Sequence, residues 1–282
     1  MRFGIHVPQF GDYGDPNQLA ALAREAEDSG WDGFFIWDHI QVNWPAPVAD
    51  TTVALAAIAL ATRRMRIGPI VTPLFRRNPA KLARETVSLD HLSGGRMVLG
   101  AGLGGDWFGE ISTFAGPREA RVRAAMLDES LAIITGLWSG AKFSFDGVHY
   151  QVRDAQFLPT PAQLPRIPIW LAGTWPKKPP FRRAARYDGV VPASADVEKL
   201  LAPDDIGAVR DFIAANRSDA APFDIVCSGE TSGDLALARE KVAPYAEAGA
   251  TWWLEGRLPW KESFDDFRRR VLAGPPALAS RF

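Results

Sequence analysis

The chain has a single cysteine among its 282 residues, and this scarcity limits the chemistry open to it. Cys227 has no second thiol to pair with, so an internal disulfide is impossible and metal clusters built on thiolates are excluded. It has no flanking histidine either, and the sequence contains no H-E-x-x-H or G-x-S-x-G motif. Zinc-protease and serine-hydrolase chemistry therefore have no support, and we expect no metal site.

Excess charge and long apolar runs are also missing. The formal net charge is −1, which gives no electrostatic case for binding nucleic acid or an anionic membrane. The longest apolar run, residues 53–61, is far shorter than the roughly 20 residues that span a bilayer. The first segment, "MRFGIHVPQF", resembles a strand and lacks the apolar region of a signal peptide. We expect a cytoplasmic protein with a small-molecule substrate and no membrane or nucleic-acid partner.

What the sequence does contain is a regular alternation of strand-like and helix-like segments. In the first pair, "RFGIHV" (2–7) reads as a strand, and residues 15–30 form a helix that Asp15 can cap and Gly30 can end. There are eight such pairs, and their strands are mostly apolar throughout, as in a parallel sheet covered on both faces. This predicts an α/β protein, a single (β/α)8 TIM-barrel domain (1–282) with a hairpin-containing insertion at about residues 139–166. A doubly wound sheet is the alternative, but it rarely needs eight evenly spaced units.

Polar residues at the strand ends mark a candidate active site, because the active sites of such barrels lie at the carboxyl ends of the strands. The second strand, "GFFIW", is followed by Asp38 and His39, which are costly at a buried strand end unless something uses them. His39 is the candidate acid–base catalyst, and Asp38 can shift its pKa and orient its ring. The alternative is a structural Asp–His pair that binds local backbone. His6, inside the first strand, fits a core position as well as a ligand contact.

Two glycine-containing turns and several tryptophans complete the predicted mouth. No helix opens directly after "GAGLGG" (100–105), so we interpret this turn as a surface where a flat ligand or a phosphate approaches the backbone. "AGTWPKK" (172–178) precedes a helix whose N–H groups could hold a phosphate, although a solvated basic face is equally consistent. Aromatic-lined mouths suit large planar ligands. The tryptophans expected at or near strand ends are Trp37, Trp44, Trp107, Trp175, Trp252 and Trp253.

Four stretches of the sequence carry a family resemblance. They are "FGIHVPQF…LAREAEDSGWDGFFIWDHI", "RIGPIVTPLFRRNPAKLARETVSLDHLSGGRMVLGAGLGG", "PIWLAGTWPKKPPFRRAARYDGVVP" and "GATWWLEG". Together they resemble the bacterial luciferase-like superfamily of flavin-type oxidoreductases, from residue 2 to about residue 275. The resemblance implies a (β/α)8 barrel that binds FMN or the deazaflavin F420 in its mouth. An Asp-His pair in place of Glu-His favours F420.

The resemblance also implies roles for individual residues. His39 takes part in hydride-transfer catalysis, and a non-proline cis peptide between Pro69 and Ile70 supports the cofactor ring. The glycines after the fourth strand lie beside the cofactor, and the turn after the fifth strand binds its phosphate. The implied cofactor-binding residues are Asp38, Pro69, Ile70, Gly102, Gly104, Gly173 and Thr174.

The substrate contacts are expected from tryptophans at the mouth, namely Trp44, Trp107 and Trp253. Trp44 resembles a tryptophan of F420-using sugar-phosphate dehydrogenases, although its spacing from His39 is one residue longer. Those enzymes carry a glutamate soon after the glycines of the fourth strand. This chain has Gly105 and Asp106 there, with Glu110 further on. This difference weakens the inference that the chain shares the activity of those enzymes on sugar phosphates.

The sequence thus predicts F420-dependent hydride transfer to or from a small organic substrate. An FMN-dependent monooxygenase that uses reduced flavin and O₂, fed by a separate flavin or F420 reductase, is the alternative. A flavin-free lyase or isomerase that acts on a phosphorylated metabolite belongs to a different class and also stays open. The resemblance further implies a homodimer.

Overall fold

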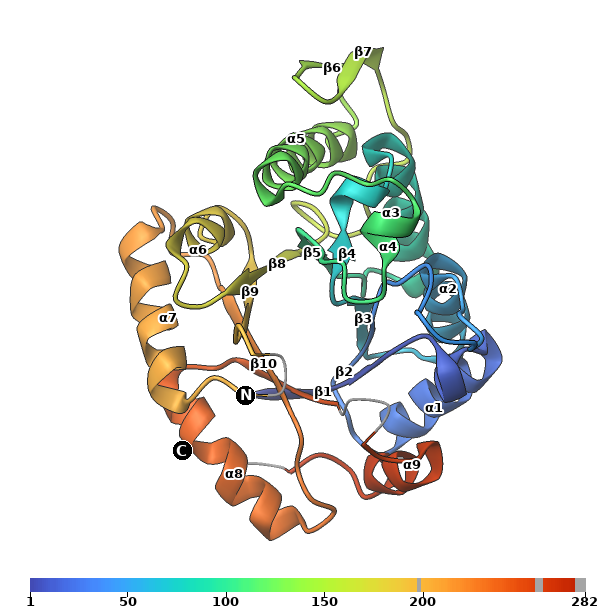
Figure 1. Ribbon diagram of the computed structural model, residues 1–282, viewed down its shortest axis with the longest axis vertical. Coiled ribbons are helices and arrows are strands. Elements are labelled where there is room, and N and C mark those ends of the chain that lie inside the picture. The colour runs from blue at the N-terminus through green and yellow to red at the C-terminus, as the bar shows by residue number, and fades with distance from the viewer. Residues whose placement is uncertain (197–198, 257–260, 277–282) are drawn as a thin grey trace.

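The computed structural model describes residues 1–196, 199–256 and 261–276, which form a parallel β-barrel surrounded by helices (Figure 1). The predicted TIM-barrel architecture is confirmed, with each barrel strand parallel to its neighbours. The strands follow the order β3 (Arg66–Pro69), β2 (Gly33–Ile36), β1 (Arg2–Val7), β11 (Trp252–Glu255), β10 (Asp224–Gly229), β9 (Gly189–Ala193), β8 (Ile169–Thr174), β5 (Leu99–Gly102) and β4 (Thr72–Pro73).

The sheet closes into a barrel where β3 and β4 meet β5. The two segments β3 and β4 follow each other in the chain, and both lie against β5. The N–H of Val98 donates to the carbonyl of Ile67 at 2.8 Å, just before β5 begins. Two glycines permit this close approach. A Cβ on Gly68 would lie 2.0 Å from the Val98 carbonyl oxygen, and one on Gly100 would lie 2.1 Å from that of Pro69. Any side chain at either position would therefore separate the two strands.

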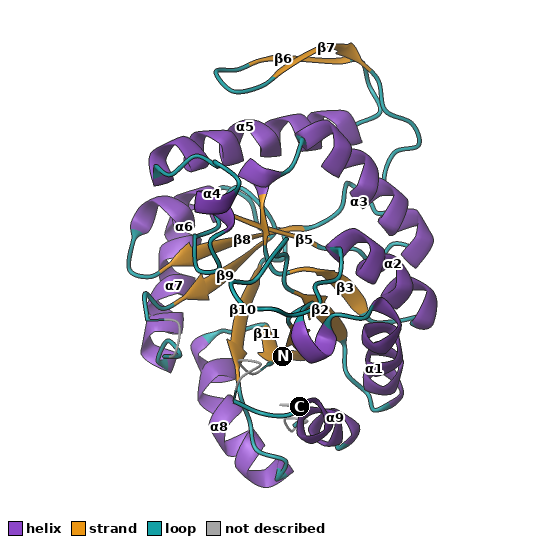
Figure 2. Ribbon diagram, turned by 45° about the vertical axis from the view of Figure 1, so that its right-hand side comes forward, coloured by secondary structure: helices purple, strands orange, loops and turns teal. Residues whose placement is uncertain are grey.

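Helices follow the strands and cover the outside of the barrel (Figure 2). Their starts are set by polar residues visible in the sequence, since Asp15 accepts the N–H of Asn17 at 2.8 Å and Asn78 accepts that of Lys81 at 3.1 Å. None of the described helices combines the length and apolar character that crossing a membrane requires. The helices are α1 (Pro16–Asp28), α2 (Thr51–Ala61), α3 (Pro79–Ser93), α4 (Glu110–Thr113), α5 (Ala120–Trp138), α6 (Lys178–Ala184), α7 (Pro203–Asn216), α8 (Leu235–Ala248) and α9 (Phe264–Leu272), with 3₁₀ turns η1 (Gly11–Tyr13) and η2 (Leu74–Arg76).

Side chains alternate along each strand between two apolar layers. The outer layer packs between strands and helices, and the inner layer fills the barrel. Aromatic rings dominate the inner layer, where Phe35, Trp170 and Trp252 lie within 5.3 to 5.8 Å of one another. The inner layer consists of Phe35, Ile70, Val98, Trp170, Val191, Val226, Trp252 and Leu254. The barrel is thus a packed core that leaves ligand chemistry to its ends.

The predicted insertion is confirmed as a hairpin that projects beyond α5 (Figures 1 and 2). It consists of β6 (Phe143–Asp146) and β7 (Gln151–Ala155), which pair antiparallel. Glu129 of α5 accepts the N–H groups of Val148, His149 and Tyr150 at 2.9 to 3.0 Å. The insertion connects α5 to the amino end of β8. It therefore lies at the end of the barrel opposite the carboxyl ends of the strands.

A buried guanidinium fixes α2 and α3 against the barrel. The Arg96 side chain donates to the backbone carbonyls of Ala59, Thr62, Met65 and Ser93 at 2.6 to 2.9 Å. Because Arg96 is buried, these carbonyls have no water to replace the guanidinium. A lysine cannot replace Arg96 here, because an ammonium group lacks the planar set of N–H donors of the guanidinium.

We predict that Arg96→Lys lowers the free energy of unfolding by about 2–4 kcal/mol, because several buried carbonyls lose their donors. Urea unfolding followed by circular dichroism measures this difference. Arg63→Lys is the matched control, since Arg63 is exposed, and it should change stability by less than about 0.5 kcal/mol. Equal stability of the two variants would contradict the structural role of Arg96.

Candidate active site

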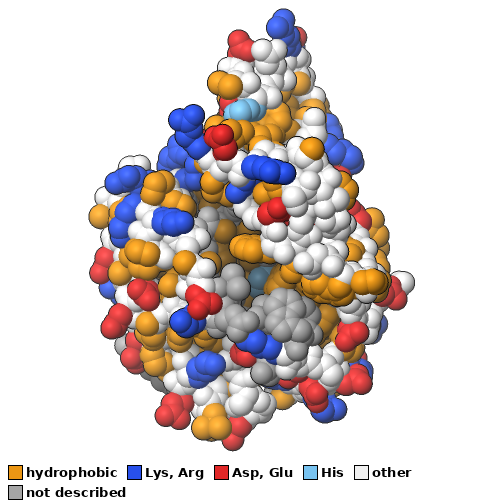
Figure 3. All heavy atoms as spheres, in the orientation of Figure 1, with side chains coloured by type: hydrophobic (Ala, Val, Ile, Leu, Met, Phe, Trp, Pro, Cys, Tyr) orange, Lys and Arg blue, Asp and Glu red, His pale blue; other side chains and the backbone are white. Residues whose placement is uncertain are grey.

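The carboxyl ends of the barrel strands face the viewer in Figure 1 and form the mouth of the barrel. In the same orientation, the surface is hollowed at its centre, with hydrophobic side chains beside the hollow (Figure 3). The segment after β2 contributes His39 to this end of the barrel. The ring of His39 lies 5.8 Å from that of Trp37 and 4.7 Å from that of Phe108, the latter from the segment after β5.

His39 and Glu110 form the charged centre of the mouth. The Nδ1 atom of His39 lies 2.8 Å from Oε2 of Glu110, and both side chains are largely buried. The same carboxylate accepts the N–H of Ile40 at 2.7 Å and pairs with the guanidinium of Arg76. Glu110 begins the short helix α4, and Arg76 ends η2. One carboxylate therefore joins the segments that follow β2, β4 and β5.

The charge of Glu110 decides which ring nitrogen of His39 carries the hydrogen that lies between them. Burial raises the pKa of Glu110, but hydrogen bonds from His39 and Ile40 and the charge of Arg76 outweigh it and hold the pKa below its ordinary value of 4.5. An ionised carboxylate can only accept hydrogen bonds, so Nδ1 of His39 carries the hydrogen that Glu110 binds. In the neutral imidazole the lone pair is then on Nε2. The arrangement leaves Nε2 as the atom that can accept and return a proton.

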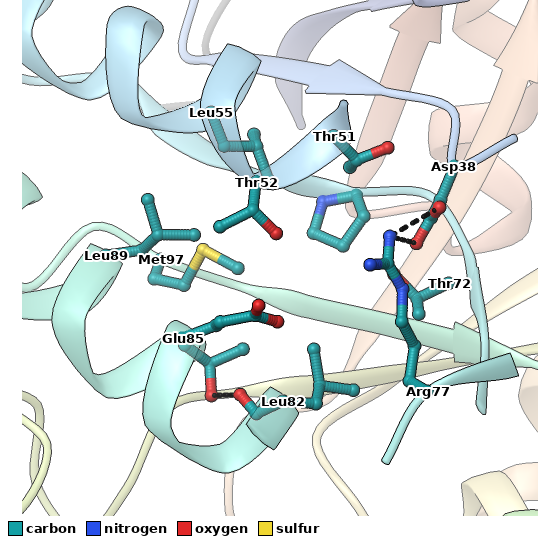
Figure 4. A pocket seen from close by; sticks show the side chains of 12 residues that line it. Asp38, Thr51, Thr52, Leu55, Thr72, Arg77, Leu82, Glu85, Leu89 and Met97 are labelled. Carbon is teal, nitrogen blue, oxygen red and sulfur yellow. Dashed lines mark hydrogen bonds and ion pairs between the residues drawn. The ribbon is translucent and has the colours of Figure 1, made fainter. Parts of the chain in front are cut away.

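Asp38 faces away from His39, and the prediction that it orients the imidazole is wrong. Side chains alternate in direction after β2, so residue 38 turns toward the helices. Its carboxylate accepts hydrogen bonds from Nη2 of Arg77 at 2.8 and 2.9 Å (Figure 4). It also lies 3.3 Å from Nη2 of Arg76. The pocket in Figure 4 lies between α2 and α3 and has about 10 Å³ of free space, room for about one water. The Asp38 carboxylate is thus committed to Arg77 and not offered to a cofactor in the mouth.

The third strand departs from regular geometry one residue later than predicted. The non-proline cis peptide joins Ile70 to Val71, not Pro69 to Ile70. Pro69 still pairs in register with Ile36 of β2, so the regular strand ends only after it. The Ile70 carbonyl accepts Nε2–H of His6 at 2.9 Å. Burial lowers the pKa of His6 to about 4, so this imidazole is neutral and serves as a donor to the backbone.

Small residues form a floor at the mouth. A Cβ on Gly102 would lie 2.8 Å from Cγ2 of Val71 and 3.4 Å from Cβ of Ala172, so these positions adjoin. Gly104 has φ of +65°, which favours glycine. The indole Nε1 of Trp37 is buried and has no hydrogen-bond partner among the described residues. A buried donor without a partner is costly unless a ligand satisfies it.

The predicted phosphate site after β8 is only partly supported. A Cβ on Gly173 would lie 2.8 Å from Cβ of Pro180, so this glycine lets α6 pack closely and does not face a ligand. Near its start α6 carries Pro179 and Pro180, which have no N–H to donate. The ammonium of Lys178 lies 3.6 Å from the centroid of a tryptophan ring. Thr174, partly exposed on the inner side of β8, remains a candidate contact.

The three tryptophans expected to contact substrate occupy different places. Trp44 packs edge to face on Phe108, with centroids 5.5 Å apart, and so lies one ring away from His39. Trp107, in the segment after β5, is exposed. Trp253 is fully buried in the outer layer, with its ring 5.2 Å from that of Tyr245 on α8. The prediction that Trp253 contacts substrate is wrong, because it faces the opposite side of β11 from the barrel interior.

Several residues of the site had no predicted role. From the sequence, Glu110 stands out only as a displaced glutamate, and Arg76 and Arg77 only as part of the family-like stretch. The amide of Gln9 donates to the His39 carbonyl at 2.6 Å. The available signal for these residues was their position, since each follows a predicted barrel strand.

The sequence matches a known family profile over nearly its whole length. The profile of luciferase-like monooxygenases matches residues 1–272. The F420-dependent glucose-6-phosphate dehydrogenase of Mycolicibacterium smegmatis is 33% identical over 232 residues, which is 79% of this chain and 68% of that protein. That of Gordonia bronchialis is 33% identical over 221 residues, or 72% of this chain and 63% of that protein. Matches to such dehydrogenases span 50% to 68% of their length.

Solved structures with the same fold cover almost the entire chain. An F420-dependent secondary alcohol dehydrogenase in complex with an F420-acetone adduct has a TM-score of 0.78 at 17% identity, covering 96% of this chain and 97% of that one. The oxygenating constituent of 3,6-diketocamphane monooxygenase from Pseudomonas putida, in complex with FMN, has a TM-score of 0.76 at 16% identity, covering 97% and 96%. At these identities the likeness concerns the fold.

We predict that Glu110→Gln destabilises the protein in a pH-dependent manner. The pKa of Glu110 is lower in the folded chain than its ordinary value, so its stabilising contribution is fully present above about pH 4.5 and is lost as the pH falls through the folded pKa. The variant should lose about 1–3 kcal/mol of unfolding free energy at neutral pH, and this difference should shrink in acid. Urea unfolding over a pH series tests this. The exposed Glu119, changed to Gln, is the control, and a pH-independent difference would contradict the assignment.

Proposed function

The chain belongs to the luciferase-like monooxygenase family, and we propose that it is an F420-dependent oxidoreductase that moves a hydride to or from a small organic substrate. The observation that carries this proposal is the hydrogen-bonded pair of His39 and Glu110, in which the carboxylate binds Nδ1 and leaves Nε2 of the imidazole for proton transfer. Relatives that are named F420-dependent dehydrogenases support the choice of cofactor.

The floor of the mouth fits a flat polar ring. Val71, Gly102 and Ala172 adjoin there without large side chains, and the unpartnered indole N–H of Trp37 offers a donor. We propose that these residues hold the ring system, with Gly104 and Thr174 nearer to the rest of the cofactor. F420, when bound, supplies the carbon that accepts or gives up a hydride.

His39 supplies the proton chemistry that accompanies hydride transfer. A substrate hydroxyl that becomes a carbonyl must lose a proton, and Nε2 of His39 can accept it because Nδ1 is already protonated and bound to Glu110. The carboxylate of Glu110 then stabilises the imidazolium. In the reverse direction Nε2 returns the proton. Gln9 and Arg76 hold the backbone on either side of the catalytic ring by binding the carbonyls of His39 and Asp38.

FMN is the second candidate cofactor, and the family's description as monooxygenases favours it. The same floor and the same imidazole would serve a flavin. In that case a separate reductase would supply the reduced cofactor, and O₂ would be a co-substrate. Binding titrations with both cofactors separate the two cases.

We also propose that the protein forms a homodimer through α2. This helix is apolar on all sides, a pattern typical of buried helices, yet Val53 and Leu60 on it are 57% and 73% exposed. Leu92 at the end of α3, which packs beside α2, is also exposed. A second copy of the same surface would cover these side chains.

For the chemistry, we expect purified protein to bind F420 more tightly than FMN. We expect His39→Ala to cut the rate of hydride transfer with bound F420 by about 10²–10⁴-fold, because the positioned base is lost. Cofactor affinity should change only a few-fold, since ring and phosphate contacts remain. Stopped-flow absorbance measures the rate, and fluorescence titration measures the affinity. His149→Ala, in the remote hairpin, is the control. An unchanged rate in His39→Ala would make this residue structural.

For the assembly, we expect Leu60→Glu to shift the protein from dimer to monomer, because the charge would be buried at the interface. Sedimentation velocity at several concentrations measures this. Leu237→Glu on α8, also an exposed leucine on a helix, should leave the dimer intact. A wild-type protein that stays monomeric throughout would contradict the proposed interface.

A further inference from the structure

We propose that the substrate of this site is a neutral, largely apolar organic molecule and not a phosphorylated sugar. The inference rests on the proposed function and specifies a substrate class different from glucose 6-phosphate, which the names of the related dehydrogenases carry. It concerns the surface beside His39. Four large apolar side chains there, Ile40, Trp44, Trp107 and Phe114, are 40% to 67% exposed, and we refer to them as the apolar rim.

The apolar rim belongs to two segments that are bound together beside the catalytic pair. Residues 37–50 follow β2 and residues 103–117 follow β5. The amide of Gln41 donates to the Phe108 carbonyl and to Oγ1 of Thr113, each at 3.1 Å. Phe10 packs edge to face on both Trp44 and Phe108, with centroids 5.8 and 5.5 Å apart. A substrate that reaches His39 from this side therefore meets aromatic rings.

Charge in these two segments is of one sign. Neither residues 37–50 nor residues 103–117 include a lysine or an arginine, and together they carry four carboxylates. Asp106 accepts the N–H groups of Ile111 and Ser112. Although partial desolvation opposes it, these bonds lower the pKa of Asp106 below its ordinary value. Asp38 and Glu110 are paired with Arg77 and Arg76, so the negative charge that a phosphate dianion beside the rim would meet is that of Asp106.

The two arginines at the end of η2 are already paired with carboxylates. Arg76 pairs with Glu110, and Arg77 binds both oxygens of Asp38. Releasing either to a phosphate would leave a buried carboxylate without its partner, which is strongly unfavourable. The two segments of the rim thus supply no cation of their own to a phosphate, and they offer the exposed apolar surface that marks sites for apolar ligands.

Calorimetric titration of the protein, with and without bound F420, tests this proposal. The neutral probes are cyclohexanol, benzyl alcohol and 1-octanol, and the charged probe is glucose 6-phosphate. We expect at least one neutral probe to bind in both states, and glucose 6-phosphate to bind more weakly. Trp44→Ala and Trp107→Ala should each weaken the neutral probe by about three- to tenfold through lost apolar contact. Leu164→Ala, a change at a more exposed apolar residue in the insertion at the other end of the barrel, should not.

The proposal is overturned if no neutral probe binds, if glucose 6-phosphate binds more tightly than every neutral probe, or if both tryptophan variants bind like the control. A failure to bind F420 overturns the proposed function instead. The titrations without cofactor then still decide the substrate class, so the two failures are distinguishable.

Discussion

The carboxylate of Glu110 is the interaction on which the mouth of this barrel depends. It accepts hydrogen bonds from a side chain and a backbone amide after β2 and pairs with a guanidinium after β4, while its own helix follows β5. Burying a carboxylate is unfavourable unless such partners surround it. The three segments therefore stabilise one another only together, and the orientation of His39 follows from that mutual dependence.

Below the site, small residues let neighbouring strands of the barrel lie close together on one side. Gly68 and Gly100 let the third and fourth strands approach each other closely, and Gly102 continues the same small surface upward to the mouth. Aromatic rings fill the interior below. The site thus combines a rigid, packed base with a floor free of bulky side chains, which suits a flat cofactor.

The fold could be predicted because its signals are local. Alternating apolar segments and polar caps such as Asp15 and Asn78 lie within a few residues of what they determine. His39 could be predicted for the same reason, since it follows a strand. Its partner could not, because 71 residues separate it from Glu110 and only the closed barrel brings them together.

Adjacency in the sequence gave wrong predictions where the direction of a side chain decides its role. Asp38 adjoins His39 in the chain but faces the helices, and Trp253 adjoins Trp252 but lies on the other side of β11. A strand pattern that is apolar on both faces does not say which face is inner. For α6, by contrast, the sequence held a usable signal, since Pro179 and Pro180 visibly remove N–H donors from the helix start.

The hairpin of β6 and β7 projects from the molecule, and it is attached at a place separate from the active site. It is anchored by Glu129 on α5 and joins the barrel at the amino end of β8, away from the mouth. Insertions, deletions or a fluorescent label at this point change the outline of the molecule while leaving the catalytic end intact. The hairpin is therefore a point of attachment through which the protein can be immobilised with its active site facing the solution.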